Sequence, residues 1–128
     1  MRMLESNSLF MLERSMDYLW TKQTAILDNI TNADTPNYKA KVVTFEEELR
    51  QKLEEAGRSR TPRQAVRSVL EEAQVTVAQA PGSTRLDDNG VNVTEQSVEL
   101  VRNAYQLQYV MNSISGHING LRSVIRGQ

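Results

Sequence analysis

The side chains of this sequence that could perform acid–base chemistry are glutamates in short clusters. These clusters occupy positions 46–48, 54–55 and 71–72. Consecutive residues on a helix point in diverging directions, and the sequence places no second catalytic group opposite any cluster. We therefore interpret the clusters as solvated helix faces, and we predict no catalytic residues and no enzymatic activity.

The residue types also give little support for a metal site or for a catalytic nucleophile. The chain contains no cysteine and one histidine, His117, which has no second histidine as a partner. The segment Asp87–Gly90 resembles part of a calcium loop. If Gly90 is aligned with the invariant glycine of that loop, however, Arg85 and Gln96 fall at the first and last ligand positions. We predict no metal site and no cofactor.

Composition excludes two further classes of partner. The chain has 128 residues and a formal net charge of −1, with acidic and basic residues interspersed. Such a surface creates no long-range field that would attract nucleic acid or an anionic membrane. No apolar run approaches the roughly 20 residues of a membrane-spanning helix. The first residues also lack the apolar core and cleavage site of a signal peptide, so we expect none to be removed.

The apolar residues are concentrated near the two ends, and near the N-terminus they repeat with alternating spacings of three and four. This pattern predicts a coiled-coil helix over residues 6–33, capped by Ser6 or Ser8 and ended by the turn before Pro36. Only Gln23 interrupts the apolar stripe. The stripe, which we call the first seam, consists of Leu9, Leu12, Met16, Leu19, Ile26 and Ile30.

The same spacing recurs near the C-terminus and predicts a second helix over residues 94–126, with Thr94 as its N-cap. Its stripe, the second seam, consists of Leu100, Ala104, Leu107, Met111, Ile114, Ile118, Leu121 and Ile125. At ~1.5 Å per residue the two helices would be about 40 and 50 Å long. We expect them to pack as an antiparallel coiled-coil pair. Apolar residues outside the seams, such as Trp20 and Tyr105, would then need helices from neighbouring subunits to cover them.

The polar middle of the chain predicts short elements and no single central core. Thr44–Glu47 has the pattern of a capping box and would start a helix that reaches about residue 56. Pro62 could begin a second short helix, although this piece could equally be a mobile loop. Val75–Val77 and Val91–Val93 could pair as one small hairpin, with turns predicted at Pro81–Gly82 and Asn89–Gly90. The predicted fold is mainly α, with an N-terminal helix and turn (1–40), a small middle region (41–93) and a C-terminal helix (94–128).

The segment from Leu27 to Ala40 resembles the N-terminal signature of the bacterial flagellar rod and hook family, Asn-Ile-Ala-Asn-Ala-x-Thr-Pro-Gly-Tyr-Lys. Thr31 replaces the usual alanine, and Asn37 replaces the common glycine, whose left-handed backbone asparagine tolerates. The short chain and the segment 86–93 look most like the proximal rod members. The matching signature residues are Asn29, Ile30, Asn32, Ala33, Thr35, Pro36, Tyr38 and Lys39.

This resemblance implies a structural subunit of the proximal rod in the flagellar basal body. Family members are exported by the flagellar type III apparatus and polymerise through their terminal helices into the drive shaft that transmits torque. The implied partners are copies of the chain, other rod proteins, and membrane-ring and export-gate components, with the rod spanning the periplasm. A helical adaptor or export chaperone that forms a dimeric bundle is the alternative interpretation.

Overall fold

The computed structural model describes residues 6–80 and 91–127, except the side chains of Glu46 and Glu47. The fold is mainly helical. In chain order its elements are α1 (Asn7–Thr31), β1 (Lys41–Thr44), α2 (Glu46–Gly57), α3 (Pro62–Glu72), β2 (Thr76–Gln79) and α4 (Val93–Ile125).

Short polar side chains start the two long helices. The Ser6 hydroxyl accepts a hydrogen bond from the Leu9 amide at 3.1 Å, as one of the two predicted caps of α1 should. In α4 the cap is Asn92, whose side chain accepts from the Glu95 amide at 3.2 Å. The prediction of Thr94 as the N-cap was therefore wrong, because the helix begins one residue before Thr94.

The short helices begin without the predicted capping box. Thr44 is the last residue of β1 and pairs with Thr76, so its backbone belongs to the strand. Phe45 occupies the N-cap position of α2 and makes no side-chain capping bond. The second short helix does form, and Pro62 is its first residue, where a missing amide proton costs nothing.

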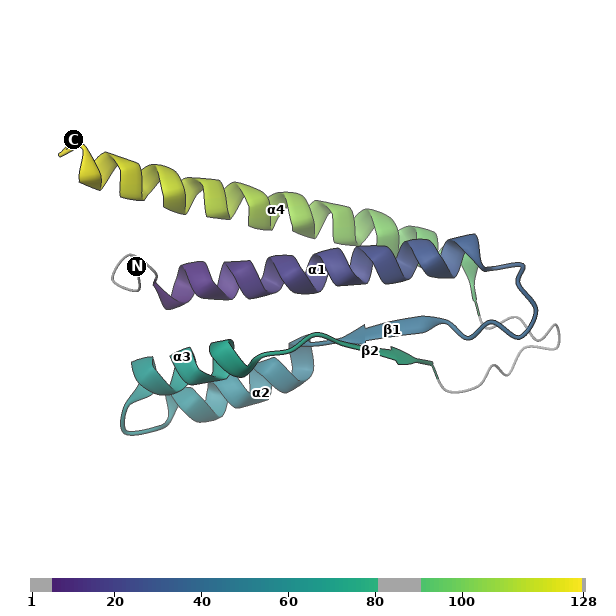
Figure 1. Ribbon diagram of the computed structural model, residues 1–128, viewed down its shortest axis with the longest axis horizontal. Helices are drawn as coiled ribbons and strands as arrows, with labels where there is room; N and C mark the ends of the chain where they lie inside the picture. The colour runs from purple at the N-terminus through teal and green to yellow at the C-terminus, as the bar shows by residue number, and fades with distance from the viewer. Residues whose placement is uncertain (1–5, 81–90, 128) are drawn as a thin grey trace.

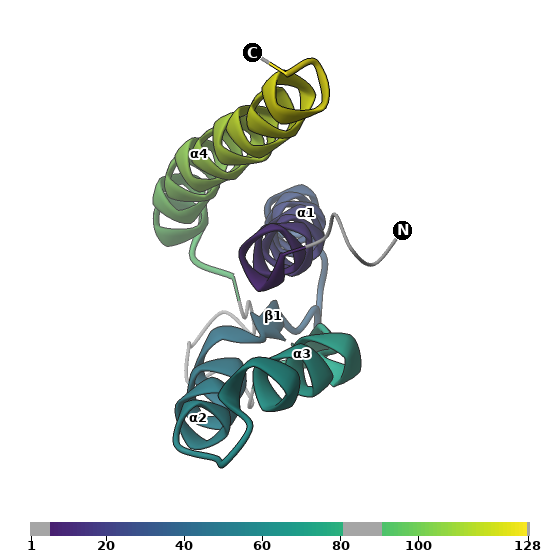
Figure 2. The same ribbon diagram turned by 90° about the vertical axis from the view of Figure 1, so that its left-hand side faces the viewer.

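Helix α1 lies between α4 on one side and the middle region on the other (Figures 1 and 2). Its contacts with α4 follow a regular order along the chain. Asn29 binds Gln96, Lys22 lies 3.6 Å from Glu99, and the carbonyl of Leu19 accepts from Asn103. Successive residues of α4 thus contact progressively earlier residues of α1.

The strands of the middle region pair differently from the prediction. β1 and β2 form a two-stranded antiparallel sheet in which Val43 lies opposite Val77, with α2 and α3 in the connection between the strands. Val91, assigned to the predicted hairpin, is instead a buried residue before α4. The prediction of a hairpin between 75–77 and 91–93 was wrong, because the periodicity of a strand does not identify the strand with which it pairs. The predicted turns at Pro81–Gly82 and Asn89–Gly90 lie outside the described residues.

One apolar cluster draws buried side chains from all of the described helices, so the expectation of no central core was also wrong. Tyr18 of α1 stacks on Phe45 at the start of α2, with ring centroids 5.2 Å apart. Leu70, contributed by α3, is a buried member of this cluster and is 1% exposed. The buried members of this cluster are Tyr18, Leu19, Phe45, Leu49, Leu70, Leu107 and Val110.

The buried position of Leu70 leads to a prediction on stability. Leu70→Ala should lower the free energy of unfolding by about 2–5 kcal/mol, because it removes apolar burial and leaves a cavity. Leu27→Ala, at a side chain that is 46% exposed, should change it by about 0.5 kcal/mol or less. Urea unfolding followed by circular dichroism measures both changes. Equal losses would show that Leu70 does not anchor this core.

Candidate functional site: the signature junction and the exposed helical face

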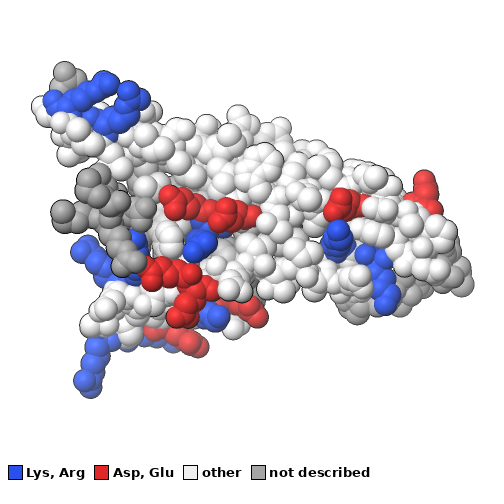
Figure 3. Space-filling view, in the orientation of Figure 1, with Lys and Arg blue, Asp and Glu red and all other residues white. Residues whose placement is uncertain are grey.

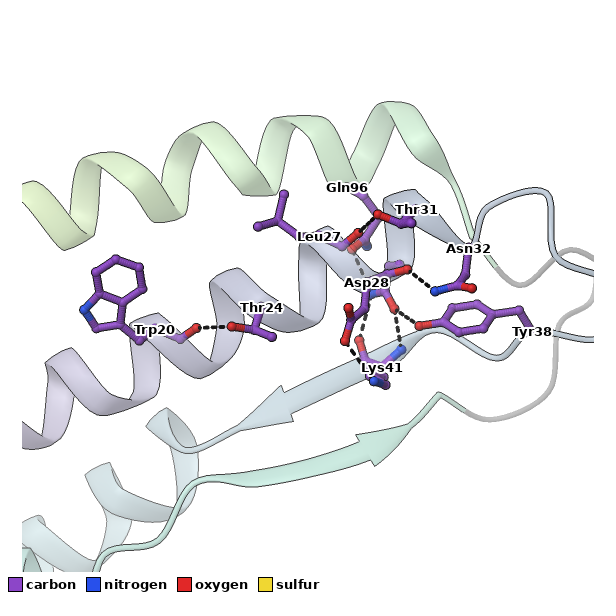
Figure 4. A network of polar contacts seen from close by, with 10 residues as sticks. Trp20, Thr24, Leu27, Asp28, Thr31, Asn32, Tyr38, Lys41 and Gln96 are labelled. Carbon is purple, nitrogen blue, oxygen red and sulfur yellow. Dashed lines mark hydrogen bonds and ion pairs between the residues drawn. The ribbon is translucent and has the colours of Figure 1, made fainter.

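The side chain of Asn29, near the end of α1, makes four hydrogen bonds that hold the signature segment together. Its partners Tyr38, Lys41 and Gln96 lie together beside the end of α1 (Figure 4). Its oxygen accepts from the Lys41 amide at 2.8 Å and from the Tyr38 hydroxyl at 3.1 Å. Its nitrogen donates to the Lys41 carbonyl at 3.0 Å and to Gln96 Oε1 at 2.9 Å. One amide therefore connects α1, the start of β1 and the start of α4. We call this network the signature junction.

Asn29 is only 1% exposed, so its polar atoms must find hydrogen-bond partners within the protein. A buried amide that lacks partners costs about 1–3 kcal/mol, and here both acceptor directions and both donor protons are used. The aligned partners explain why asparagine occupies this position. Aspartate of the same shape would lack the two donor protons.

An ion pair lies beside this network. Lys41 Nζ lies 2.9 Å from Asp28 Oδ2. The hydrogen bond to Asp28, and then its charge, raise the pKa of Lys41 above its ordinary value of 10.5. Lys39, the lysine of the family signature, is exposed. The spacing of the motif did not indicate Lys41 or Asp28, whose roles depend on where β1 meets α1.

The turn after α1 uses the remaining signature residues. The Asn32 side chain donates to the Asp28 carbonyl at 2.9 Å and accepts from the Thr35 hydroxyl at 3.2 Å. Asn37 has a φ of 62°, the left-handed conformation that its replacement of glycine predicted. The turn directs the chain back along α1 towards Lys41.

A small apolar cluster closes the turn against the entry to α4. Val91 is 2% exposed, and Ala33 and Ala40 are also buried beside it. Tyr38 packs on the same cluster, so its ring and its hydroxyl both serve the junction. The signature thus joins the two terminal helices at the end where α4 begins.

The structure divides the residues of the two predicted seams by exposure. Buried positions are Leu19, Ile26 and Leu107. Intermediate positions are Leu9, Leu12, Met16, Ile30, Leu100, Ile114 and Leu121. Exposed positions are Ala104, Met111, Ile118 and Ile125. Half of the second seam is therefore available to solvent in the isolated chain.

Asn103 and Val110 point towards α1 where the pattern had suggested Ala104 and Met111. Asn103 is 1% exposed and donates to the Leu19 carbonyl at 2.9 Å and to Gln23 Oε1 at 2.7 Å. Sequence reasoning missed this position because a polar residue weighs against burial. The polar interruption at Gln23 was the available signal, since a buried amide needs a partner across the interface.

Both long helices carry apolar side chains that are exposed to solvent. Trp20 and Leu27 of α1 are 54% and 46% exposed, while Met111 and Ile118 of α4 are 49% and 47% exposed. The sequence contains no charged residue from Asn103 to Leu121. In Figure 3 a broad uncharged area accordingly covers much of α4. Exposed apolar side chains on an uncharged surface of this kind are typical of protein–protein contact sites.

Several charged groups of the described residues form surface pairs. Arg50 lies 2.6 Å from Glu54, and Arg67 lies 3.6 Å from Glu71. No group of three potential metal ligands occurs in the described ranges. None of the helices in this part of the chain is long and apolar enough to cross a membrane. Asp87–Gly90, the segment that resembles part of a calcium loop, lies outside the described residues.

Paired terminal helices with an apolar outer face define the class of structural assembly subunits. No family model matches the sequence. The chain is 32% identical over 126 residues to the flagellar basal body rod protein FlgB of Bacillus subtilis, covering 97% of each chain. It is 30% identical over 118 residues to FlgB of Escherichia coli, with 82% and 83% coverage of the two chains. FlgB of Aquifex aeolicus is 26% identical over 117 residues, with 91% and 90% coverage.

These similarities extend over nearly the whole sequence and over nearly whole relatives. The chain belongs to the FlgB family of flagellar basal body rod proteins.

The signature junction leads to a second prediction. Asn29→Ala should lower the free energy of unfolding by at least ~2 kcal/mol, because it leaves several buried partners unpaired. Tyr38→Phe removes a single hydroxyl and should cost about 0.5–1.5 kcal/mol. Hydrogen exchange of the Lys41 amide should accelerate in the first variant. An unchanged exchange rate would show that Asn29 does not hold this strand.

The ion pair predicts a dependence on alkaline pH. A raised pKa means that the charged lysine stabilises the fold below 10.5 and that this contribution is lost as pH rises through the folded-state value. The stability difference between the wild type and Lys41→Met should therefore be constant near neutrality and shrink above about pH 10.5. Lys39→Met, at an exposed position two residues away, is the control. Identical pH profiles for the two variants would contradict this role of Asp28.

Proposed function

We propose that this chain is a structural subunit of the proximal rod in the flagellar basal body. The observation that carries the proposal is the exposed apolar surface shared by α1 and α4, together with the similarity to FlgB proteins over nearly the whole chain. An isolated chain gains nothing from such a surface. If neighbouring subunits in an assembly cover this surface, its removal from water contributes a favourable free energy of about 25 cal/mol per Å² of apolar area.

In this proposal the terminal helices form an antiparallel coiled-coil pair, and the exposed seam positions contact neighbours. Heptad spacing and the order of contacts between α1 and α4 support the pair. The seam residues that are buried complete the subunit itself. Those that are exposed, including Met111 and Ile118, would pack against other copies and other rod proteins.

The wider role follows from the same premise. The chain would be exported through the flagellar type III apparatus without a cleaved signal peptide and would polymerise into the drive shaft that crosses the periplasm. Membrane-ring and export-gate components would be its neighbours at the base. Packed side chains at many shared seams could transmit torque, because close-packed interiors have low compressibility.

In-frame deletion of the gene, followed by electron microscopy of isolated basal bodies, tests the function. We expect rings without a rod in the deletion strain and complete rods after complementation. Intact rods in the deletion strain would contradict the proposal and would favour an adaptor or chaperone.

A single exposed residue tests the surface. Met111→Asp should leave the subunit folded, since the side chain is 49% exposed, but should reduce swimming at least about tenfold by placing a charge in a dry contact. Asn112→Asp adds the same charge at the next, exposed residue and should retain motility. Equal swimming of the two variants would contradict a specific contact at Met111. Leu107→Asp is a poor test, because Leu107 belongs to the subunit core.

A further inference from the structure

The end of α4 extends beyond the beginning of α1. Asn7 and Ser8, at the start of α1, line the same open cleft as His117 of α4. In Figure 1 the yellow C-terminal end of α4 extends past the first turn of α1. Within the turns of α4 that follow His117, Ile118 is 47%, Val124 76% and Ile125 71% exposed. We call residues 118–125 the terminal turns.

A long apolar cleft lies between α4 and the surface formed by α1 and α2. Its volume is about 580 Å³, and its lining includes Met11, Tyr18, Leu49, Leu53, Tyr105 and Val110. A second open cleft of about 510 Å³ shares three residues with the first, Met11, Leu53 and Tyr109. The two form one groove along α4, which we call the α4 groove. It reaches the end of the subunit from which the terminal turns project.

The lining of the α4 groove suits an apolar helix. Arg50 is the one charged residue that lines its larger part in the described structure, and its guanidinium lies 2.6 Å from Glu54. Covering this part of the groove would therefore bury no uncompensated charge. Tyr105 and Tyr109 lie at its edge and are 71% and 72% exposed. Tyrosines of this kind are frequent anchors of protein interfaces.

Taking the proposed rod function as its premise, we propose that the terminal turns of one copy insert into the α4 groove of a second copy. Ile118, Leu121 and Ile125 have the i, i+3, i+7 spacing with which a helix occupies an apolar groove. Both surfaces belong to this chain, and in the terminal turns Ile118 and Ile125 are exposed while Leu121 is half-buried. Their combination covers the exposed end of α4 and the exposed tyrosines in one contact.

The geometry of such a contact determines the kind of assembly it produces. The terminal turns and the α4 groove are different surfaces of the same chain, so the contact is heterologous. A heterologous contact leaves one end and one groove unused in every pair, and copies continue to add unless the rotation closes a ring. A symmetric dimer through one shared surface would instead stop at two copies.

Two double variants of the full-length chain separate the two surfaces. Val124→Asp with Ile125→Asp disables the terminal turns, and Tyr105→Glu with Tyr109→Glu disables the groove. All of these side chains are at least 71% exposed, so both variants should keep the wild-type circular dichroism spectrum. In sedimentation velocity, each variant alone should show at least a tenfold weaker self-association than the wild type.

An equimolar mixture of the two variants is the decisive sample. It contains one intact end and one intact groove, so it should recover the affinity of a single contact and stop at dimers. A wild-type chain that stays monomeric at all accessible concentrations would overturn the proposal, as would a mixture that does not recover. Loss of association in the groove variant alone would indicate another occupant and would also overturn it.

Cysteine cross-linking provides an independent measurement, because the chain contains no cysteine. Val124→Cys mixed with Tyr109→Cys should form a disulfide-linked heterodimer under mild oxidation. Glu72→Cys, at an exposed position of α3, replaces Tyr109→Cys in the control mixture. Equal cross-linking in the two mixtures would overturn the docking.

Electron microscopy of basal bodies distinguishes failure of the docking from failure of the rod function. Normal rods in a strain that carries only the Val124→Asp, Ile125→Asp chain, but none in the deletion strain, would overturn the docking and leave the subunit role intact. Normal rods in the deletion strain would overturn both. Rods absent from both strains, with the variant chain folded, is the result we expect.

Discussion

The arrangement of the whole chain depends on one buried amide. Asn29 joins the end of α1 to the first residue of β1 and to the first turns of α4 through four hydrogen bonds. Lys41 is the first residue of β1 and Gln96 lies in the first turn of α4, while Tyr38 lies in the connection between α1 and β1. Because the side chain is almost fully buried, an alternative arrangement would leave several polar groups unpaired. The turn with Asn37 and the packing of Tyr38 both support this geometry.

Local signals in the sequence predicted the long helices well and their exact faces less well. Apolar spacing located α1 and α4. Ser6 caps α1 and Pro62 begins α3, each being one of two alternatives that the sequence left open. The spacing could not tell Ala104 from Asn103 as the inward position, because the preference depends on Gln23 in a different helix. The pairing of β1 with β2 was also invisible, since it joins segments separated by two helices. The signature identified the junction, but the partners Lys41 and Gln96 required the fold.

The subunit balances its own stability against exposed apolar surface. Its core is completed by a few side chains from each helix, among which Leu70 and Leu107 are buried. Meanwhile α4 leaves aromatic and aliphatic side chains open over most of its length. Charged residues are most frequent on α2 and α3, where Arg50–Glu54 and Arg67–Glu71 form surface pairs, and the sequence has none from Asn103 to Leu121 of α4. This distribution keeps charge away from the part of α4 that neighbouring subunits would cover in the proposed assembly.

The position of α4 at the end of the sequence has a consequence for how the chain folds. The contacts that close the core join residues far apart in sequence, such as Asn103 with Leu19 and Gln96 with Asn29, separated by 84 and 67 positions. Contacts between residues so far apart in sequence form only after the entropy cost of closing the intervening loop has been met. A chain that emerges from its N-terminus first can make α1, α2 and α3 but cannot bury their common face until α4 follows. The buried contacts between α1 and α4 therefore form only when both helices are present in the same compartment.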